Sequence, residues 1–319
     1  MYSTLNDQLQ ILQQIKTVDI EHKKTDLESN FKFCLNIMKK NSKSFYFAAQ
    51  SLNHDQRNGV AALYAFCRFV DDIVDESDKS RNNINIILDE LKTSINLLAI
   101  GSSSHHPIMM AFGQTMRNYH IPVSYIHELI EGVRMDLTNE LQVRYNTVKG
   151  LNLYCYRVAS TVGLMMVHIF MDNPKPSILA RASDLGLAMQ LTNILRDIRE
   201  DYMRGRIYLP REDMDLYGVT EKDISLGIMT DNFKTLIDYE IEKTKGIYKV
   251  AELGIKDLPS EVRYTILLSS RVYGDILNQI KRDKYQLLTK RAVVSKKRKL
   301  YIALKLKTKL TLQKLNFMN

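Results

Sequence analysis

The chain has 319 residues, of which 45% are hydrophobic and 25% charged, so it can bury one large core or two modest ones and is neither disordered nor fibrous. Only 13 Gly and 6 Pro are present, too few for the frequent turns of an all-β fold of this length. The net charge of +9 is local, because residues 284–319 carry 11 Lys and Arg without an Asp or Glu and leave −2 for the rest.

Helical periodicity predicts ten helices, one after another along the chain, with loops at 77–83, at 101–107 and at Asp172–Pro174. The predicted ranges are 28–50, 55–75, 83–99, 107–118, 123–137, 150–171, 176–203, 232–253, 259–288 and 295–314. This pattern indicates an all-α fold. No composition shift marks a linker, so we expect a short arm at 1–27, a single helical domain at 28–300 and a basic tail at 301–319.

Several motifs that would define other classes are missing from the sequence. The three cysteines are far apart and odd in number, which excludes a disulfide framework and fits a reducing compartment. No HExxH, GxGxxG or GxxxxGK[ST] occurs, which argues against zinc hydrolases, Rossmann enzymes and P-loop proteins. The N-terminus lacks a signal peptide and no run of about 18 apolar residues exists, so a cytoplasmic protein without a membrane span is expected.

Two of the predicted helices carry acidic stripes. In YAFCRFVDDIVDE, the residues Tyr64, Arg68, Asp71 and Asp75 fall within a sector of about 60° of one helix face. In QLTNILRDIRED, one face is shared by Gln190, Asn193, Asp197 and Asp201. Both stripes end in two carboxylates that lie one turn apart.

Carboxylates at i and i+4 repel each other, and here they stand among apolar residues. Mg²⁺ would compensate the charge, since it binds one or two carboxylates, keeps water ligands and takes phosphate oxygens from a substrate. Two facing stripes would therefore hold a diphosphate through bridging metals. A solvated helix face is the alternative for either pair alone, but two pairs with aligned polar partners favour the metal site.

These segments resemble the two aspartate-rich signatures of the squalene/phytoene synthase family, the head-to-head trans-prenyltransferases. The second signature continues into GRIYLP at 205–210, and NSKSFYFAA at 41–49, LYCYRVASTVGLMM at 153–166 and KRAVVSKKRKL at 290–300 also agree. The resemblance covers roughly residues 30–300. One departure is Asn41, where some members have His before the SKS triplet.

The resemblance implies an isoprenoid-synthase-like helical bundle around a central apolar cavity, in which 28–300 is the catalytic domain. It implies that Mg²⁺, with Mn²⁺ as a substitute, is bound by Asp71, Asp75, Asn193, Asp197 and Asp201. Contacts to the diphosphates would come from Ser42, Lys43, Ser44, Arg68, Arg206, Tyr273 and Arg291. The prenyl channel or reaction centre would be lined by Phe45, Tyr64, Tyr154, Val158, Gly163 and Gln190. The role of Asp136 stays open.

The implied reaction ionises an allylic diphosphate and shields the carbocation in an apolar, aromatic-lined site while a second prenyl diphosphate captures it. The product of that step is a cyclopropylcarbinyl diphosphate, which rearranges to a linear hydrocarbon. Geranylgeranyl diphosphate giving phytoene for carotenoid biosynthesis is preferred, without NADPH. Farnesyl diphosphate giving dehydrosqualene, squalene or presqualene diphosphate is the alternative, and a non-catalytic assembly factor of the same fold is an alternative of another class.

The basic tail lacks the aromatic residues that stack nucleic-acid bases, apart from Tyr301 and Phe317, so no nucleic acid is expected. An anionic membrane surface is the more plausible partner, because the substrates and the product are lipids. A plain solvated helix remains an equal alternative for this segment.

Overall fold

The computed structural model describes residues 24–75, 81–137 and 143–316, and these are almost entirely helical. The predicted all-α fold class is therefore confirmed. Contacts between Cα atoms divide the chain into two compact units. Unit 1 comprises Met1–Leu137 and Arg157–Leu179, and unit 2 comprises Thr138–Tyr156 and Ala180–Asn319. The predicted division into arm, catalytic domain and tail stays a prediction, and most of the 1–27 arm lies outside the described residues.

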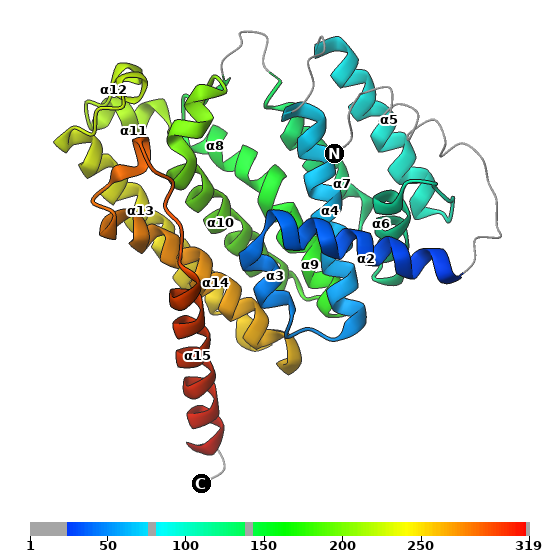
Figure 1. Cartoon of the computed structure of the whole chain (residues 1–319). Coiled ribbons are helices and arrows are strands. Elements are labelled where there is room, and N and C mark those ends of the chain that lie inside the picture. Colours follow the sequence, from blue (N-terminus) through cyan, green and yellow to red (C-terminus); the bar gives the residue numbers. More distant parts are fainter. Residues whose placement is uncertain (1–23, 76–80, 138–142, 317–319) are drawn as a thin grey trace. The chain divides into compact units, whose positions relative to one another are not determined.

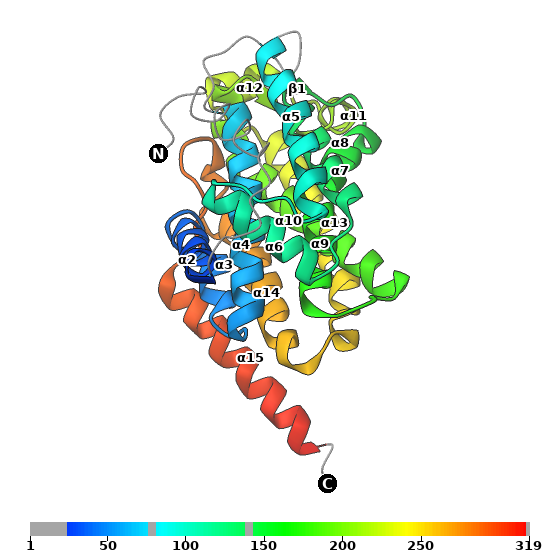
Figure 2. The ribbon, with the colours of Figure 1, turned by 90° about the vertical axis from the view of Figure 1, so that its right-hand side faces the viewer.

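Unit 1 begins with α2 (Lys24–Asn41), α3 (Lys43–Ala49) and α4 (His54–Asp75). It continues with α5 (Arg81–Ala99), α6 (Pro107–Asn118) and α7 (Val123–Arg134), and it also holds α9 (Thr161–Phe170). Helix α2 lies across α4 and also contacts α6 (Figure 1). Helices α5, α6 and α7 pack beside one another (Figure 2). Helices α4 and α6 contact each other through the fully buried Phe66 and Phe112, whose rings stack with centroids 4.1 Å apart.

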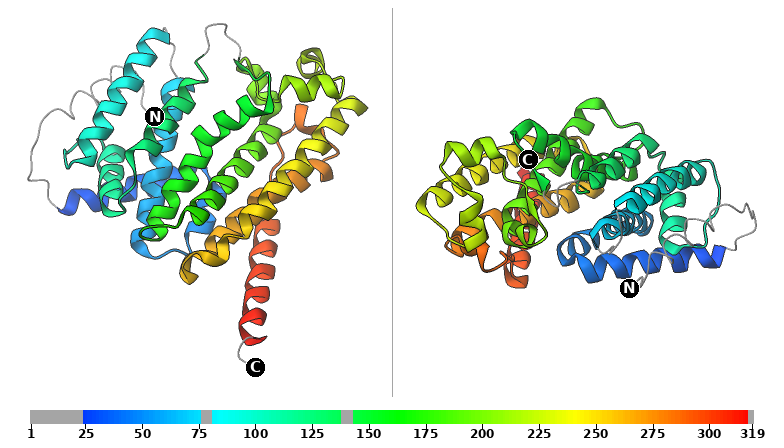
Figure 3. Two further views of the ribbon diagram at one scale, coloured as in Figure 1. Left: turned by 180° about the vertical axis from the view of Figure 1, so that it is seen from behind. Right: turned by 90° about the horizontal axis from the view of Figure 1, so that it is seen from above.

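Unit 2 contains α8 (Val148–Cys155), α10 (Pro176–Met203) from Ala180 onward, α11 (Arg211–Leu216) and α12 (Glu221–Leu226). It ends with α13 (Asp231–Glu252), α14 (Ser260–Arg282) and α15 (Lys296–Asn316). Helices α13 and α14 run side by side (Figure 3) and share a core that includes the fully buried Phe233, Leu236, Ile237 and Leu277. Short 3₁₀ turns, η3 (Ile255–Asp257) and η4 (Gln286–Leu288), follow α13 and α14.

The predicted helices are present, with local differences that have physical causes. The range 28–50 is two helices, because Ser42 leaves the helical conformation and caps α3 with its side chain. The range 150–171 is interrupted by a π turn, η2 (Tyr156–Ser160), between α8 and α9. Helices α11 and α12 were not predicted, because six residues are too short to show a helical period.

Two short strands, β1 (Val143–Arg144) and β2 (Arg206–Ile207), pair in parallel in unit 2. Gly205, with φ of +78°, forms the left-handed turn that connects α10 to β2, a conformation that suits glycine. The Arg144 side chain secures this junction, since its Nη1 donates to the Gly205 carbonyl at 2.8 Å and its guanidinium binds both carboxylate oxygens of Glu221. The segment that follows the second acidic stripe is thereby fixed to the start of α12.

Within the described residues, one helical stretch, Val148–Phe170, is long and apolar enough to cross a membrane, with a mean hydropathy of 1.3 over its best window. Half of that window is buried inside the protein. Core helices meet the same criteria of length and composition, so this finding by itself does not indicate a membrane span.

Candidate functional site

The first acidic stripe lies on α4, in unit 1, near the C-terminal end of the helix. The helical spacing puts Tyr64, Arg68, Asp71 and Asp75 on one face, as the sequence predicted. The Arg68 guanidinium, however, pairs with the neighbouring Asp72, with its Nη2 2.5 Å from Oδ1 of that carboxylate. Asp72 therefore restrains the arginine that we expected to meet a diphosphate.

The Asp71 carboxyl is in an unusual electrostatic environment. Asp71 remains open to solvent at the surface of α4. Even so, enough protein surrounds its carboxyl that desolvation, together with the charge of Asp75, raises its pKa to about 7, against the opposing effect of Arg68. Asp136, whose role the sequence left open, lies close enough to contribute to the same rise. A cation bound here would relieve this repulsion.

The SKSF segment forms the start of α3. The Ser42 hydroxyl accepts a hydrogen bond from the Phe45 backbone N–H at 3.4 Å, Lys43 is exposed and Ser44 is half-buried. The ring of Phe45 tilts against that of Tyr64, with centroids 6.3 Å apart. Two of the predicted channel residues are thus brought together. Asn41, the departure from the family pattern, donates from its side chain to the Ile37 carbonyl at 3.0 Å and so belongs to the end of α2.

Val158 lies in the π turn η2, and Gly163 follows in α9. Such single π turns inside α-helices are frequent at functional sites. The turn rests against Gly132 of α7, where an added Cβ would lie 2.6 Å from Cβ of Arg157 and 2.8 Å from Cγ1 of Val158. The Arg157 Nε also donates to Glu128 at 2.9 Å, so α7 fixes the position of the predicted channel residue Val158.

The second acidic stripe lies on α10, in unit 2. The side-chain amide of Asn193 donates to Oε1 of Gln190 at 3.2 Å, which joins two predicted residues. Oδ1 of Asn193 is buried and has no hydrogen-bond partner in the described part of the chain. A buried acceptor of this kind is costly unless something binds it. It is therefore a candidate metal ligand.

The Asp197 carboxylate is held by two arginines. Both of its oxygens accept hydrogen bonds from Arg196, the residue that precedes it on α10. Arg291 also binds both oxygens, with its Nε 2.8 Å and its Nη2 3.0 Å away. Burial opposes the charge on Arg196, but hydrogen bonds to Asp197 and to Tyr273 raise its pKa. The predicted residues Tyr273 and Arg291 are thus brought to the second stripe.

The donor set on α10 suits Mg²⁺ better than a transition metal, because it consists of carboxylate and amide oxygens. No group of three or more His, Cys, Asp or Glu side chains that could hold a metal is found among the described residues. Mg²⁺ needs only one or two carboxylates when phosphate and water complete its shell. Asn193, Asp197 and Asp201 therefore fit such an ion.

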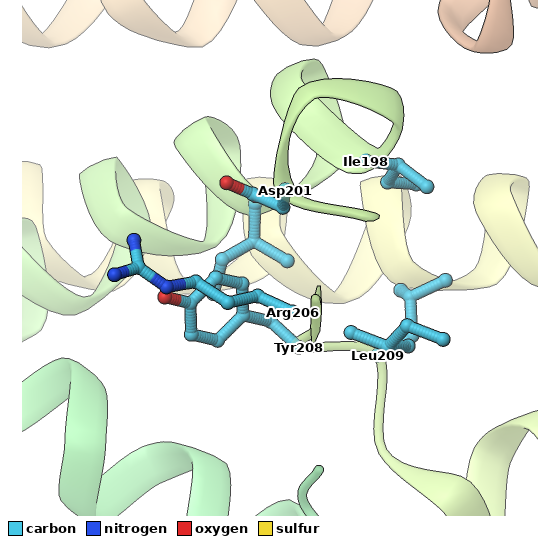
Figure 4. A pocket seen from close by; sticks show the side chains of 7 residues that line it. Ile198, Asp201, Arg206, Tyr208 and Leu209 are labelled. Carbon is cyan, nitrogen blue, oxygen red and sulfur yellow. The ribbon is translucent and has the colours of Figure 1, made fainter. Parts of the chain in front are cut away.

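A small pocket in unit 2 extends this site (Figure 4). Asp201, Arg206 and Tyr208 gather on one side of it, with Ile198 and Leu209 on the other. Its lining is completed by Ile194 and Ile207. Arg206, a predicted diphosphate contact, therefore shares a pocket with a predicted metal ligand.

Three tyrosine rings cluster in unit 2. The Tyr154 hydroxyl donates to that of Tyr208 at 3.2 Å, and their rings stack with centroids 5.0 Å apart. Tyr145 adds a third ring, 5.5 Å from Tyr154 and 6.0 Å from Tyr208. Only Tyr154 was singled out from the sequence. Tyr208 could have been found from its place in GRIYLP, but nothing in the sequence indicated Tyr145.

The comparisons with known proteins identify the family of the chain. Residues 38–298 match the family model described as squalene/phytoene synthase. The chain is 33% identical to a phytoene synthase of Arthrospira platensis over 278 residues, which cover 83% of this chain and 88% of the relative. It is also 33% identical to a 15-cis-phytoene synthase of Synechococcus elongatus, over 86% of this chain and 91% of that one.

Among solved structures, a dehydrosqualene synthase in complex with a ligand superposes with a TM-score of 0.81 and 30% identity. The superposition covers 90% of this chain and 98% of that one. The chain therefore shares its all-α fold with this dehydrosqualene synthase.

Proposed function

The chain belongs to the squalene/phytoene synthase family, and we propose that it joins two molecules of a prenyl diphosphate head to head through a cyclopropylcarbinyl diphosphate. It is an enzyme of the prenyltransferase type. The observation that carries the proposal is the donor set on α10. Oδ1 of Asn193, which has no hydrogen-bond partner among the described residues, lies on the same helix face as Asp197 and Asp201. We infer geranylgeranyl diphosphate as the substrate and phytoene as the product, because the curated relatives are phytoene synthases.

In this proposal, Asp71 and Asp75 on α4 and Asn193, Asp197 and Asp201 on α10 hold Mg²⁺. The metal supplies positive charge to the departing diphosphate when it is bound. The remaining diphosphate contacts are assigned to Ser42, Lys43, Ser44, Arg68, Arg206, Tyr273 and Arg291. An arginine guanidinium suits this task because its planar fork binds two phosphate oxygens at once.

Aromatic faces stabilise the carbocation that ionisation leaves behind. Phe45 and Tyr64 supply one pair of rings, and Tyr145, Tyr154 and Tyr208 supply a cluster of three more. Because these rings are fixed by contacts with one another, they are oriented before substrate binds. Val158, Gly163 and Gln190 are assigned to the channel for the prenyl chains.

Farnesyl diphosphate giving dehydrosqualene is the alternative that a specific observation favours, since a dehydrosqualene synthase is 30% identical and shares the fold. The non-catalytic assembly factor is less well supported, because all four aspartates of the two stripes are present. NADPH is not expected to take part in the reaction.

We also propose a cytoplasmic location with peripheral binding of α15 to an anionic membrane. Leu300, Tyr301 and Leu304 are exposed on this helix, interspersed with lysines, and the described side chains of α15 include no acidic residue. Exposed apolar side chains beside cationic ones favour a lipid interface over a nucleic acid.

The test is to incubate the purified enzyme with Mg²⁺ and either geranylgeranyl or farnesyl diphosphate, without NADPH, and to identify the hydrocarbon by mass spectrometry. We expect phytoene from the twenty-carbon substrate. If only the fifteen-carbon substrate reacts and it gives dehydrosqualene, farnesyl diphosphate replaces geranylgeranyl diphosphate as the assigned substrate. Accumulation of a cyclopropyl diphosphate that becomes squalene only after NADPH is added would overturn the non-reductive assignment, and no product from either substrate would overturn the proposal itself.

A further inference from the structure

The two arginines that bind Asp197 differ in how firmly they are held. Arg196 is adjacent in sequence, its side chain is only 15% exposed, and Tyr273 binds it as well. Arg291 comes from the segment before α15, and its side chain is 47% exposed. Arg291 also forms a long ion pair with Glu200, 3.9 Å from Nε to Oε1. Arg196 is therefore a fixed partner of Asp197, and Arg291 is one that can leave.

Both carboxylate oxygens of Asp197 are engaged by N–H groups of these arginines. A divalent cation coordinates through the same oxygen lone pairs. Binding a metal at Asp197 thus requires at least one N–H donor to be displaced and a guanidinium to be placed beside a second positive charge. Both requirements oppose binding of a metal alone.

A diphosphate changes this balance, because its oxygens are good acceptors for a guanidinium fork. Arg291 could then exchange one bidentate acceptor for another. Since it is half-exposed, little packing needs to be broken for that movement.

We propose that Arg291 is an exchangeable counterion of Asp197 that couples metal loading of the second stripe to the arrival of diphosphate. Arg291 neutralises Asp197 until diphosphate binds, and then transfers to the diphosphate as the metal takes its place. This inference rests on the proposed function, because it requires a metal and a diphosphate at α10. It assigns to Arg291 the task of preventing metal from occupying the site alone.

The experiment measures Mn²⁺ affinity by electron paramagnetic resonance, with and without inorganic pyrophosphate. We expect Arg291→Gln to bind Mn²⁺ about tenfold more tightly than the wild type without pyrophosphate, which converts to ~1.4 kcal/mol. Pyrophosphate should then strengthen Mn²⁺ binding less in the variant than in the wild type. Lys290→Gln, which removes the same charge from the adjacent exposed residue, should change neither quantity.

A double-mutant cycle assigns the effect to Asp197. In the Asp197→Asn background, Arg291→Gln should no longer change Mn²⁺ affinity, because the competition for that carboxylate is gone. Arg291→Lys, which keeps the charge without the fork, should give an intermediate affinity.

Equal Mn²⁺ affinity of the wild type and Arg291→Gln, or an equal response of the two to pyrophosphate, would overturn the exchange. If the wild type makes hydrocarbon product in that case, the proposed function still stands. If the wild type binds no Mn²⁺ even with pyrophosphate, the metal mechanism fails together with the exchange.

Discussion

Asp275 of α14 binds Arg298 of α15 through two hydrogen bonds, from Nε and Nη2 of the arginine, each 3.0 Å long. Asp275 is buried, and Nη2 of Arg282 also donates to its Oδ2 at 2.8 Å. These arginines keep the pKa of Asp275 low despite its burial. Arg298 is thus part of the packing of unit 2, while Lys305, Lys307 and Lys309, further along α15, are exposed. Figure 1 shows α15 extending to the C-terminal end of the chain.

From this arrangement we predict that the lysines of α15 contribute to membrane binding, while Arg298 contributes to the packing of α15 against α14. Changing Lys305, Lys307 and Lys309 together to Gln should weaken co-sedimentation with anionic liposomes at low salt, since each basic group near such a surface contributes about 1 kcal/mol. The melting temperature and the turnover of detergent-dispersed substrate should stay unchanged.

The matched control changes three exposed lysines elsewhere in unit 2, Lys222, Lys249 and Lys256, to Gln. It removes the same charge and should leave liposome binding largely intact. Equal loss of binding in both triple variants would show that net charge, and not α15, is responsible.

Arg298→Ala, in contrast, should lower the melting temperature by leaving the buried Asp275 with one arginine fewer.

The aspartates of the stripes are predicted to act in turnover. Asp71→Asn and Asp197→Asn should each lower turnover by about 100-fold or more, the scale of single preorganised electrostatic groups. The same loss is expected for Asp75→Asn and Asp201→Asn, and for the wild type in EDTA. Asp55→Asn, at the exposed start of α4, is the control and should keep full activity. Full turnover by the wild type in EDTA would refute the metal mechanism.

The melting temperatures of the variants should distinguish the first stripe from the second. Asp71→Asn relieves repulsion with Asp75 and should not lower the melting temperature. Asp197→Asn weakens the anchoring of the largely buried Arg196 and should lower the melting temperature. A variant that loses turnover while it keeps its melting temperature separates a functional role from a structural one.

Gly132 is predicted to be required for the π turn. Gly132→Ala would put a methyl group 2.6 Å from Cβ of Arg157, closer than two carbons can approach, and should destabilise the protein by about 1–3 kcal/mol. Turnover should fall as well, because Val158 would be displaced. Gly246→Ala in α13 is the control, since no atom of the part of the chain that the structure describes lies within 4 Å of its added Cβ. It should stabilise the protein by about 0.5–1 kcal/mol, and destabilisation of equal size in both variants would contradict the packing argument.

Glu240 predicts a pH dependence of stability. Its carboxyl is 3% exposed, and burial together with a hydrogen bond to Asp213 raises its pKa, while Lys243 opposes the shift. Because the folded-state pKa lies above the unfolded value of about 4.5, the folded state binds the extra proton, and stability falls as pH rises above that value toward neutrality. The melting temperature of Glu240→Gln should therefore change less with pH than that of the wild type. The variant should gain most in melting temperature relative to the wild type at the alkaline end.

The control for this prediction is Glu242→Gln. Hydrogen bonds from Lys245 and Lys281 lower the pKa of Glu242, so its contribution to stability is present above the unfolded pKa and is lost as pH falls. The two variants should therefore differ from the wild type with opposite trends in pH. Parallel profiles for wild type and Glu240→Gln would show that this carboxyl does not titrate abnormally.

The sequence by itself determined the helices and the composition of the two stripes, because both are properties of local spacing. Asp71 and Asp75, or Asn193 and Asp197, share a helix face whenever their segments are helical. The family resemblance followed from the same local motifs. Helix α12 could also have been found, since Thr220 and Asp223 form a capping box and Gly227 ends the helix in the left-handed conformation.

The tertiary structure alone decided which side chains neutralise or orient these residues. Arg291 reaches Asp197 across 94 positions of sequence, and the ring of Tyr145 joins Tyr154 and Tyr208 through the pairing of β1 with β2. Such contacts depend on how helices pack, and no periodicity of a single segment encodes the partner. For this reason the family resemblance implied that Arg291 contacts a diphosphate, while only the folded chain placed it on the carboxylate of Asp197, a predicted metal ligand.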